Sequence, residues 1–447
     1  MINSDFFRAV FNAGLVAVDP CQAVFNVASV VNDSLLIDDA TYDLAQFDRI
    51  LVIGAGKATA RMAQVVESLL GSRISQGLVI VKLGHCQPLS IIEQVEAAHP
   101  VPDAAGMSGT ERILKMVRDA DKNTLIICLL SGGASALLVS PVDGVTLEDK
   151  QQTTRLLLNA GASITELNAV RKHLSQVKGG RLAQAACPAQ LVTLILSDVI
   201  GDPLEVIASG PTAPDHSTFA DAWAVAVKYG LQQALPLNVV DYLRCGLAGK
   251  AAETVKIADG CWETTQNRIV ASLHQALDAA KNQAIQLGVS TRIILDTLQG
   301  EAREAAVWLA QRARDELAEM KPGERRCLLA GGETTVTVSG AGKGGRNQEL
   351  ALAFALEMEG VCGVSLLSAG TDGSDGPTDA AGAVVDGATV TLARRLGIEP
   401  VGFLENNDSY AFFQQLDALS GELHHFKPGP TGTNVMDMQI VLLNRPA

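Results

Sequence analysis

The sequence predicts an α/β protein of two domains, and three observations support this fold class. The 447 residues exceed the size of a typical single core, so two or more domains are expected. The composition, with 47% hydrophobic residues and 41 glycines, is typical of a compact chain. Short apolar runs alternate with amphipathic segments from about residue 49 onward, a pattern that predicts parallel strands joined by helices.

The first half contains four predicted strands, each a compact run of Val, Ile and Leu of the kind buried on both faces of a sheet. They cover Arg49–Ile53, Leu78–Lys82, Thr124–Leu130 and Leu191–Ser197. Helices are predicted between them at 58–70, 104–120, 146–159, 163–173 and 218–230. Strands separated by helices indicate a mostly parallel sheet covered on both faces, in a Rossmann-like three-layer sandwich.

The stretch Leu235–Gly260 contains a proline and several glycines, which interrupt regular structure, and it predicts a domain boundary near residue 240. The predicted domains are therefore 1–240 and 241–447. Helices of the second domain are predicted at 267–287 and 301–318. Its predicted strands are Thr291–Asp296, Arg326–Ala330, Thr334–Val338, Val364–Ala369 and Met438–Leu443. The second half is thus another α/β domain.

Charge and cysteine usage exclude several classes of protein. The formal net charge of -14 argues against a nucleic-acid or anionic-membrane partner. The eight cysteines show no CxxC and no Cys/His spacing, which indicates reduced thiols rather than a metal site. We see no signal peptide and no apolar run long enough to span a bilayer. We therefore expect a cytoplasmic protein that binds small molecules. The sequence leaves the oligomeric state open, and a homodimer is one possibility.

The clearest chemical signal in the second half is a cationic, glycine-rich loop over Gly340–Glu349. Consecutive glycine amides with lysine and arginine side chains are a common way to hold phosphate oxygens. The residues we expect to contact a nucleotide or its phosphates here are Lys343, Gly344, Gly345, Arg346 and Asn347. The alternative interpretation is a polar surface turn.

An acidic loop, Gly370–Asp379, follows this cationic loop along the chain. It carries Asp372, Asp375 and Asp379, and clustered carboxylates hold Mg2+ or direct a hydroxyl. A cationic glycine loop followed by an acidic one favours phosphoryl transfer from a metal-bound nucleotide.

Glycine-rich or acidic loops also follow three predicted strands of the first half. Gly54-Ala55-Gly56-Lys57 follows the first strand, Ser131–Ser135 the third, and Ser197–Asp202 the fourth. Ligands of open α/β sheets gather outside the carboxyl ends of the strands. Because the acidic loop also follows a strand, we expect loops of both halves to face one interdomain cleft that holds the active site.

Gly54 and Gly56 match the first two glycines of the dinucleotide pattern G-x-G-x-x-G, but Thr59 occupies the third position. The acidic residue expected at the end of the next strand is also missing, since that strand ends in Val81-Lys82. The segment therefore favours a helix N-terminus beside Lys57 that binds a carboxylate or phosphate over a nicotinamide site. A tight turn with an exposed lysine is the plain alternative.

Three further segments have both a functional and a structural interpretation. Ser131–Ser135 lacks the G-x-S-x-G pattern, and its amides and hydroxyls either hold an anion or form a plain turn. Arg171–Arg181 carries four cations and breaks at Gly179-Gly180, so it either binds an anion or forms a solvated helix face. Asp198 stands at a strand end, where it either accepts the proton of a hydroxyl or caps a helix.

The chain resembles the class II glycerate 2-kinases, whose N-terminal domain has a nominally unknown function and whose C-terminal part is a MOFRL domain. The matching strings run in order along nearly the whole chain. They are Gly54–Ala58, Ser131–Leu137, Arg171–Leu182, Ser197–Asp202, Ser209–Pro211, Gly331–Val336, Gly344–Glu349, Gly370–Ala381 and Gly429–Asp437.

This resemblance implies phosphorylation of D-glycerate to 2-phosphoglycerate with ATP and Mg2+. It implies that Lys57 and Arg346 contact the transferring phosphoryl group or the substrate carboxylate. Asp198 would then orient or deprotonate the acceptor hydroxyl.

The physical interpretation of the loops agrees with this chemistry. Glycine amides at Gly54 and Gly56 would add to the nucleotide contacts, and Asp372, Asp375 or Asp379 would hold Mg2+. A clamp on the glycerate carboxylate is expected from Ser131, Gly132, Gly133, Ser135, Arg171 and Arg181. Two other functions stay open: an NAD(P)H-dependent hydroxypyruvate reductase, a label that family members have carried, and a non-catalytic sugar-acid sensor.

Overall fold

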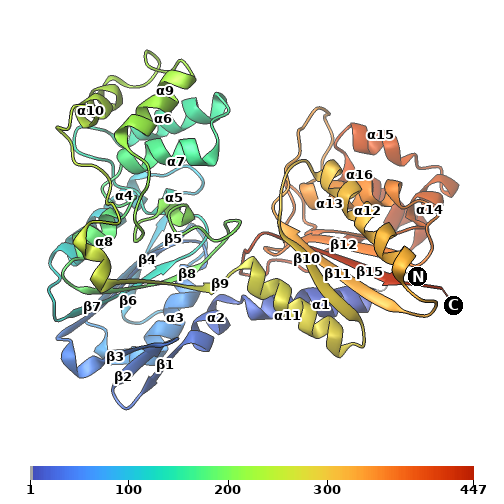
Figure 1. The fold of residues 1–447 in the computed structure, drawn as a ribbon, viewed down its shortest axis with the longest axis horizontal. Helices are drawn as coiled ribbons and strands as arrows, with labels where there is room; N and C mark the ends of the chain where they lie inside the picture. The colour runs from blue at the N-terminus through green and yellow to red at the C-terminus, as the bar shows by residue number, and fades with distance from the viewer. Residues whose placement is uncertain (1–3, 447) are drawn as a thin grey trace. The chain divides into compact units, whose positions relative to one another are not determined.

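The computed structural model describes residues 4–446, and the chain forms two compact units (Figure 1). Unit 1 comprises Met1–Asp19 together with Ala271–Ala447, and unit 2 comprises Pro20–Val270. The boundary expected near residue 240 falls inside α10 (Leu237–Leu247), which packs on α9 (Phe219–Lys228) within unit 2.

Unit 2 is built on a six-stranded sheet with the order β6-β5-β4-β7-β8-β9. Five strands pair in parallel, and a sixth lies at the edge. They are β4 (Arg49–Ala55), β5 (Gln76–Lys82), β6 (Ile92–Ala97), β7 (Thr124–Leu130), β8 (Gln190–Leu196) and the edge strand β9 (Thr265–Ala271). Numbered from β4, the order is 3-2-1-4-5-6, that of doubly wound nucleotide-binding folds. The strand order therefore reverses between β4 and β7, and we call the carboxyl ends of these two strands the switch point.

Helices cover both faces of this sheet, as the sequence predicts (Figure 1). Leu51 and Ile53 of β4 share a core with Ile113 of α4 and Leu182 of α8, whereas α3 packs on the opposite face. Alternate residues of each strand thus fill two cores. The helices are α3 (Thr59–Leu70), α4 (Ala104–Arg118), the short α5 (Ala134–Leu137) and α8 (Arg181–Ala186).

Two smaller groups complete unit 2. The helices α6 (Leu147–Asn159) and α7 (Ile164–His173) join α9 and α10 around a core that contains Leu167, Phe219 and Leu243. The helix α2 packs on α3 and precedes a three-stranded antiparallel sheet. These elements are α2 (Pro20–Val27), β1 (Ala28–Val31), β2 (Ser34–Ile37) and β3 (Ala40–Asp43).

Unit 1 contains a mixed sheet with the order β10-β11-β15-β12-β13-β14. Only β10 and β11 pair in parallel, and β15 runs antiparallel to both β11 and β12. The strands are β10 (Ser290–Leu298), β11 (Arg325–Gly332), β12 (Val364–Gly370), β13 (Gly382–Asp386), β14 (His425–Phe426) and β15 (Asp437–Asn444). The strands β11, β15 and β12 are thus neighbours in the middle of this sheet.

The helices of unit 1 pack as two groups. The first helix of the chain, α1 (Ser4–Ala17), packs on α11 (Leu273–Gln286), and α11 packs on β10 and β11. The second group surrounds α13, which contacts β12 and β13. It consists of α12 (Ala302–Glu319), α13 (Arg346–Glu357), α14 (Thr389–Arg395), α15 (Pro400–Glu405) and α16 (Ser409–Ser420).

Two predicted elements are wrong. Thr334–Val338 forms a loop rather than a strand, because the Glu301 carboxylate binds the amide and hydroxyl of Thr337 and only an isolated bridge joins Glu301 to Thr335. The helix predicted at 267–287 begins at Leu273, since the residues before it form β9. The other predicted strands and helices are confirmed to within a few residues at their ends.

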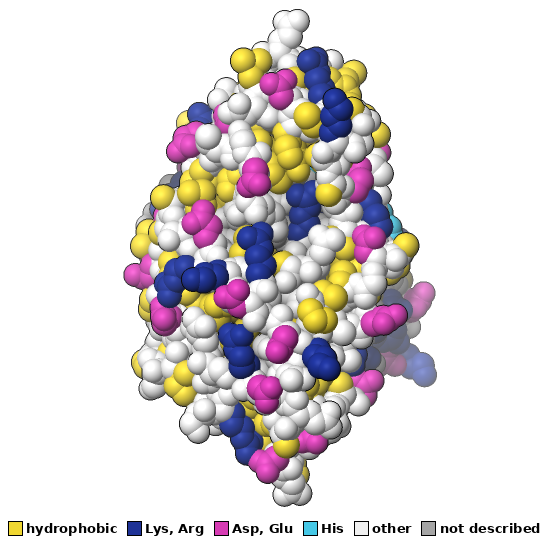
Figure 2. Space-filling model, turned by 90° about the vertical axis from the view of Figure 1, so that its left-hand side faces the viewer, with side chains coloured by type: hydrophobic (Ala, Val, Ile, Leu, Met, Phe, Trp, Pro, Cys, Tyr) yellow, Lys and Arg dark blue, Asp and Glu magenta, His cyan; other side chains and the backbone are white. Residues whose placement is uncertain are grey.

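No single helix among residues 4–446 is long and apolar enough to cross a membrane. The helices α1 and α2 meet the length and composition criteria only as a pair, and they are bent by 55° at their junction. On the face shown in Figure 2, acidic and basic side chains are interspersed without a broad basic area.

Candidate active site

The turn that carries Lys57 lies at the switch point of unit 2, directly after β4. The Lys57 amide donates to the Gly132 carbonyl (2.9 Å), and the Ala58 amide donates to Ser131 Oγ (3.0 Å). The hydroxyl of Thr59, the first residue of α3, lies 3.0 Å from the same Ser131 Oγ. Buried hydrogen bonds therefore join the loops after β4 and β7 and fix the backbone of Lys57.

The glycines of this turn are required by close packing. A Cβ on Gly56 (φ +144°) would lie 2.0 Å from Ser131 Oγ, and one on Gly54 would lie 2.3 Å from the Leu129 carbonyl oxygen. The Gly56 amide donates to the Ile80 carbonyl (3.0 Å). Amides of residues 56–58 thus already have protein acceptors, and the nucleotide contacts expected from Gly54 and Gly56 stay predictions.

The side chains of Asp198 and Lys57 contact the Gly132-Gly133 turn, Asp198 at Gly132 and Lys57 at Gly133. A Cβ on Gly132 would lie 2.3 Å from Asp198 Oδ2. A Cβ on Gly133 (φ +86°) would lie 3.1 Å from His99 Nε2 and 3.4 Å from Lys57 Cγ. The structure therefore brings together a lysine, a carboxylate and a turn that has no side chain of its own.

The Lys57 ammonium has neither a hydrogen bond nor an ion pair within the part of the chain that the structure describes. Its side chain is half-buried. A partly buried cation without a partner favours binding of an anion from outside the protein.

The structure divides the expected carboxylate clamp into two groups. Ser135 Oγ lies 2.9 Å from Ser209 Oγ, and Arg171 Nη2 donates to the Ser135 carbonyl (3.4 Å). Arg181 instead donates to backbone carbonyls of Ser175 and Ala252, both at 2.8 Å. Ser135 and Arg171 thus lie together beside the switch-point loops, whereas Arg181 joins two backbone segments.

In unit 1, the guanidinium of Arg346 is bound by two carboxylates. Its Nε and Nη2 donate to the two oxygens of Asp437 (2.6 and 3.0 Å), and its Nη1 lies 2.7 Å from Glu333 Oε1. Burial lowers the pKa of Arg346, but the hydrogen bond and charge of Asp437 outweigh this and raise it above its ordinary value. Burial also raises the pKa of the Asp437 carboxyl despite Arg346. Arg346 is therefore held in place by a bidentate pair.

Asp375 caps the helix that begins with Arg346. Its buried carboxylate accepts hydrogen bonds from the amides of Asn347 (3.1 Å) and Gln348 (2.9 Å) at the start of α13. Burial raises the pKa of Asp375 to about 6, although these hydrogen bonds oppose the shift. The carboxylate thus positions the N-terminus of α13, and Asn347 with it.

The other two aspartates of the acidic loop have separate partners. Asp379 is exposed and accepts from Tyr410 Oη (2.7 Å) and Lys427 Nζ (3.1 Å). Asp372 accepts from the amide of Ser374 through Oδ1 (2.9 Å). Within residues 4–446, no group of three or more His, Cys, Asp and Glu is placed to hold a metal ion.

Most amides of the cationic glycine loop are occupied. The Gly340 amide donates to Asn407 Oδ1 (3.0 Å), and the Lys343 amide donates to Asp408 Oδ1 (2.9 Å). Lys343 Nζ lies 4.7 Å from the centre of the Tyr410 ring. The loop is thus bound to the start of α16, and its nucleotide contacts, including those of Gly344 and Gly345, stay predictions.

Comparison with known proteins identifies the family. The DUF4147 model, a domain of unknown function, matches residues 6–244, and the MOFRL family model matches residues 326–437. D-glycerate 2-kinase of Thermotoga maritima is 43% identical over 398 residues, which cover 89% of this chain and 91% of that protein. The chain belongs to the glycerate kinase family. The resemblance seen in the sequence is confirmed, and the chain is an enzyme of the phosphotransferase class.

Solved structures of the glycerate kinase family share this fold. The crystal structure of glycerate kinase from Thermotoga maritima has a TM-score of 0.85 and 39% identity, and the match covers 98% of this chain and 99% of that chain. A relative from Agrobacterium vitis, 39% identical over 98% of this chain and 93% of its own length, carries the name of a hydroxypyruvate reductase.

For this member of the glycerate kinase family, the sequence analysis missed three side chains. Two of them contact Arg346 in unit 1, and the third contacts the Ser135 backbone in unit 2. Glu333 and Asp437 hold Arg346, and both lie in strings that resemble the family. Lys178 is fully buried and donates to the carbonyls of Ser135 (2.8 Å), Leu138 (3.3 Å) and Ala208 (3.4 Å). Its only signal in the sequence is membership of the basic run Arg171–Arg181.

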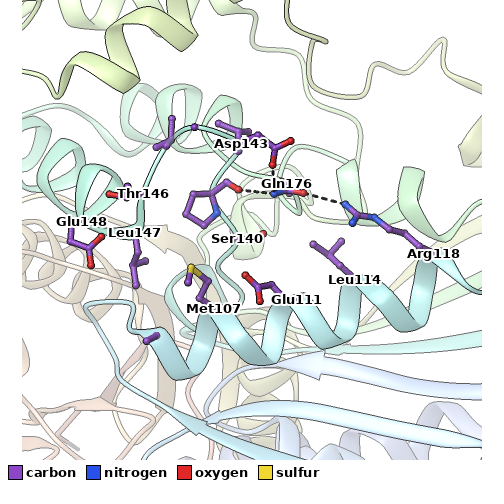
Figure 3. Close-up of a pocket in the computed structure, with 15 residues that line it drawn as sticks. Met107, Glu111, Leu114, Arg118, Ser140, Asp143, Thr146, Leu147, Glu148 and Gln176 are labelled. Carbon is purple, nitrogen blue, oxygen red and sulfur yellow. Dashed lines mark hydrogen bonds between the residues drawn. The ribbon is translucent and has the colours of Figure 1, made fainter.

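A pocket of about 560 Å³ lies elsewhere in unit 2, between α4 and the loop that leads into α6 (Figure 3). Its lining includes the carboxylates of Glu111, Asp143 and Glu148 and one cation, Arg118, which donates to Gln176 (3.2 Å). No predicted site residue lines it. An acidic lining does not suit the anionic substrates of a glycerate kinase.

Proposed function

We propose that this protein transfers the terminal phosphate of ATP to the 2-hydroxyl of D-glycerate, in the presence of Mg2+, and releases ADP and 2-phosphoglycerate. The observation that carries the proposal is the placement of Lys57 and Asp198 on the Gly132-Gly133 turn at the switch point. The relatives named glycerate kinase, which match along most of the chain, support it.

Each group at the switch point has a part in the reaction. Asp198 accepts the proton of the acceptor hydroxyl as its oxygen bonds to the terminal phosphorus of ATP, and the bond to the leaving ADP oxygen breaks. Lys57 neutralises charge on the transferring phosphoryl oxygens. Ser131 holds the two loops together, so these groups need little rearrangement.

D-Glycerate is itself an anion, and its carboxylate requires donors. We assign this role to Ser135 and Arg171 together with the Gly132-Gly133 turn. Lys178 and Arg181 act through the backbone, since their side chains bind carbonyls of the surrounding segments.

In unit 1, we assign the nucleotide phosphates to Arg346 and Lys343, with Asn347 beside them at the start of α13. Mg2+ bound with a nucleotide needs one or two protein carboxylates besides phosphates and water. Asp372 fits this need, because only its Oδ1 accepts a hydrogen bond within residues 4–446. Asp375 caps α13 and Asp379 binds Lys427, so they fit less well. When bound, Mg2+ supplies charge neutralisation on the phosphates.

The test is a coupled assay on the purified chain with D-glycerate, ATP and Mg2+. We expect ADP release and a 2-phosphoglycerate signal in phosphorus NMR. Release of 3-phosphoglycerate would keep the phosphotransferase but contradict the assignment of the hydroxyl. Absence of ADP release would overturn the proposal.

The name carried by the Agrobacterium vitis relative favours a second candidate, reduction of hydroxypyruvate by NAD(P)H. We expect no NAD(P)H oxidation, because the amides of residues 56–58 that would hold a dinucleotide pyrophosphate already have protein acceptors. Cofactor oxidation on addition of hydroxypyruvate would restore this candidate.

A further inference from the structure

We propose that His99 and Lys82 complete the anion site of Lys57, and that this site binds one oxyanion group of a reactant. The group is either the carboxylate of the acceptor or a phosphate of the nucleotide. The identification of the reactants as D-glycerate and ATP rests on the proposed function. The anion site itself follows from the side chains of unit 2 and does not depend on that function.

The residues of this site come from three neighbouring strand ends. Lys57 follows β4, Lys82 is the last residue of β5, and His99 lies two residues after the end of β6. In the parallel register, Lys82 lies opposite Ala97, and the Leu83 amide donates to the Ala97 carbonyl (3.1 Å). The sheet therefore places these side chains at one edge, beside the switch point.

The Gly133 residue brings the imidazole and the Lys57 side chain together. A Cβ at this position would lie 3.0 Å from His99 Cδ2 and 3.1 Å from His99 Nε2, and 3.4 Å from Lys57 Cγ. His85 adds a contact, because its Nδ1–H donates to the Lys57 carbonyl (2.9 Å). The imidazole thus faces the same turn as the two groups assigned to catalysis.

The charges that act on the His99 ring are positive. Burial, together with the charges of Lys57, Lys82 and His85, lowers the pKa of His99 to about 4. At neutral pH the ring is therefore uncharged and offers one N–H donor. An oxyanion in this field would be attracted by the two ammonium groups and would accept the imidazole hydrogen bond.

The acidic groups around this edge have protein contacts of their own. Glu96 accepts from the Gly84 amide (2.7 Å), and Asp103 accepts from the Ala98 amide (3.1 Å) and caps α4. Asp198 lies against Gly132, on the other residue of the turn. Lys57 and Lys82 have no ion pair with any of them within the described residues. The site is thus short of negative charge, which a bound oxyanion would supply.

The test is calorimetric titration of the whole chain, without turnover, using three probes separately: inorganic phosphate, D-glycerate, and ATP without Mg2+. The variants are His99→Phe, which removes the donor, His99→Gln, which replaces it with an amide donor, and Lys82→Met. We expect His99→Phe and Lys82→Met to weaken at least one probe by about tenfold, and His99→Gln by less than about threefold. The matched controls are Lys115→Met on α4 and His216→Ala, whose imidazole pairs with Glu205; both side chains are exposed, and both variants should bind as the wild type does.

The probes separate the two sources of the oxyanion. Loss for D-glycerate alone assigns the site to the acceptor carboxylate, and loss for ATP alone assigns it to the nucleotide. If the variants bind phosphate more weakly as well as one of these two probes, phosphate and that probe share the site of Lys57, Lys82 and His99. Wild-type affinity of Lys82→Met and His99→Phe for all three probes would overturn the proposal. If His99→Phe does not fold, Lys82→Met decides, because its half-buried side chain has no partner to lose.

A spectroscopic readout checks the role of the imidazole itself. In histidine-labelled protein, with the His99 resonance assigned by its loss in His99→Gln, phosphate should raise the pKa of His99 above about 4. An unchanged His99 titration in saturating phosphate would contradict direct contact. Because no step of this test requires ADP release, binding at this site without turnover would refute the proposed function alone.

Discussion

The cationic sites of the two units differ in how their charge is balanced. In unit 2, the ammonium groups of Lys57 and Lys82 have no hydrogen bond or ion pair within residues 4–446. In unit 1, Arg346 is bound by Asp437 and Glu333. The charges of Lys57 and Lys82 are thus left without a counter-charge from the described residues, whereas two carboxylates fix the position of Arg346 before any phosphate reaches it.

This contrast predicts different consequences when a cation is removed. An unpaired cation stabilises the fold little, so its loss should affect ligand binding and rate. A cation paired with a buried carboxylate leaves an uncompensated charge when it is removed, so its loss should affect folding as well.

The largest expected effect is on turnover in Lys57→Met. We expect kcat/KM for D-glycerate to fall by about 10³-fold, because one donor to the transferring phosphoryl oxygens is lost. The urea midpoint should match that of the wild type, since no protein partner is lost. Lys115→Met, which removes an exposed lysine of α4, is the control with full activity. Turnover within tenfold of the wild type would move the phosphoryl group away from Lys57.

At the Arg346 site of unit 1, loss of the cation should lower the free energy of unfolding. Arg346→Met leaves the Asp437 carboxylate buried without its bidentate partner, and we expect a loss of about 3–5 kcal/mol in the free energy of unfolding. The double variant Arg346→Met with Asp437→Asn should recover much of this loss. Arg314→Met breaks an exposed pair with Glu357 and should cost less than ~1 kcal/mol. Equal stability of Arg346→Met and the wild type in urea denaturation would remove the contrast between the two units.

Asp375 sharpens the comparison through pH. Its pKa is raised from 3.8 to about 6 in the folded state, so the folded protein binds the proton more tightly than the unfolded chain. Its contribution to stability is therefore fully present below pH 3.8 and is lost as the pH rises to about 6. The loss is at most ~3 kcal/mol.

The matched variant for this pH dependence is Asp375→Asn, which keeps an oxygen acceptor at the start of α13. Urea denaturation at several values between pH 4 and pH 7 should show the wild type losing stability relative to the variant. Parallel curves across this range would show that the carboxyl titrates normally.

The smallest effect is expected for Ser131→Ala. The variant removes the acceptor of the Ala58 amide and the contact with Thr59, at a cost of about 1 kcal/mol in the free energy of unfolding. Ser75→Ala removes a similar bond to the Ile50 amide at a position outside the site. Both variants should lose comparable stability, but only Ser131→Ala should lower turnover. Equal turnover in the two would show that the link between the loops is structural alone.

The sequence was sufficient for the sheet of unit 2, because its strands are apolar runs bounded by glycine-rich loops. It was insufficient where polar residues form a strand, as in β9, or where an apolar-polar alternation has no partner strand, as in Thr334–Val338. Local pattern cannot reveal whether a neighbouring backbone is available to pair.

The same limit applies to the site. Lys57, Ser131 and Asp198 could be grouped from the sequence, since each follows a strand and strand ends share one edge of a sheet. The partner of Arg346 is Asp437, which lies 91 residues further along the chain. Such long-range pairs, and the separate partners of Asp372, Asp375 and Asp379, depend on tertiary packing that no local pattern records.

The pairing of α1 with α11 has a consequence for synthesis of the protein. The face of α1 that carries Phe7, Val10 and Phe11 is buried in unit 1, yet α11 begins only at Leu273. At ribosomal rates of about 5–20 residues per second, roughly 10–50 s separate the emergence of these two helices. All of unit 2 is translated in that interval, before α11 is available to cover the apolar face of α1. Unit 2 therefore has time to fold first, and a chaperone that shields α1 would have the whole interval in which to act.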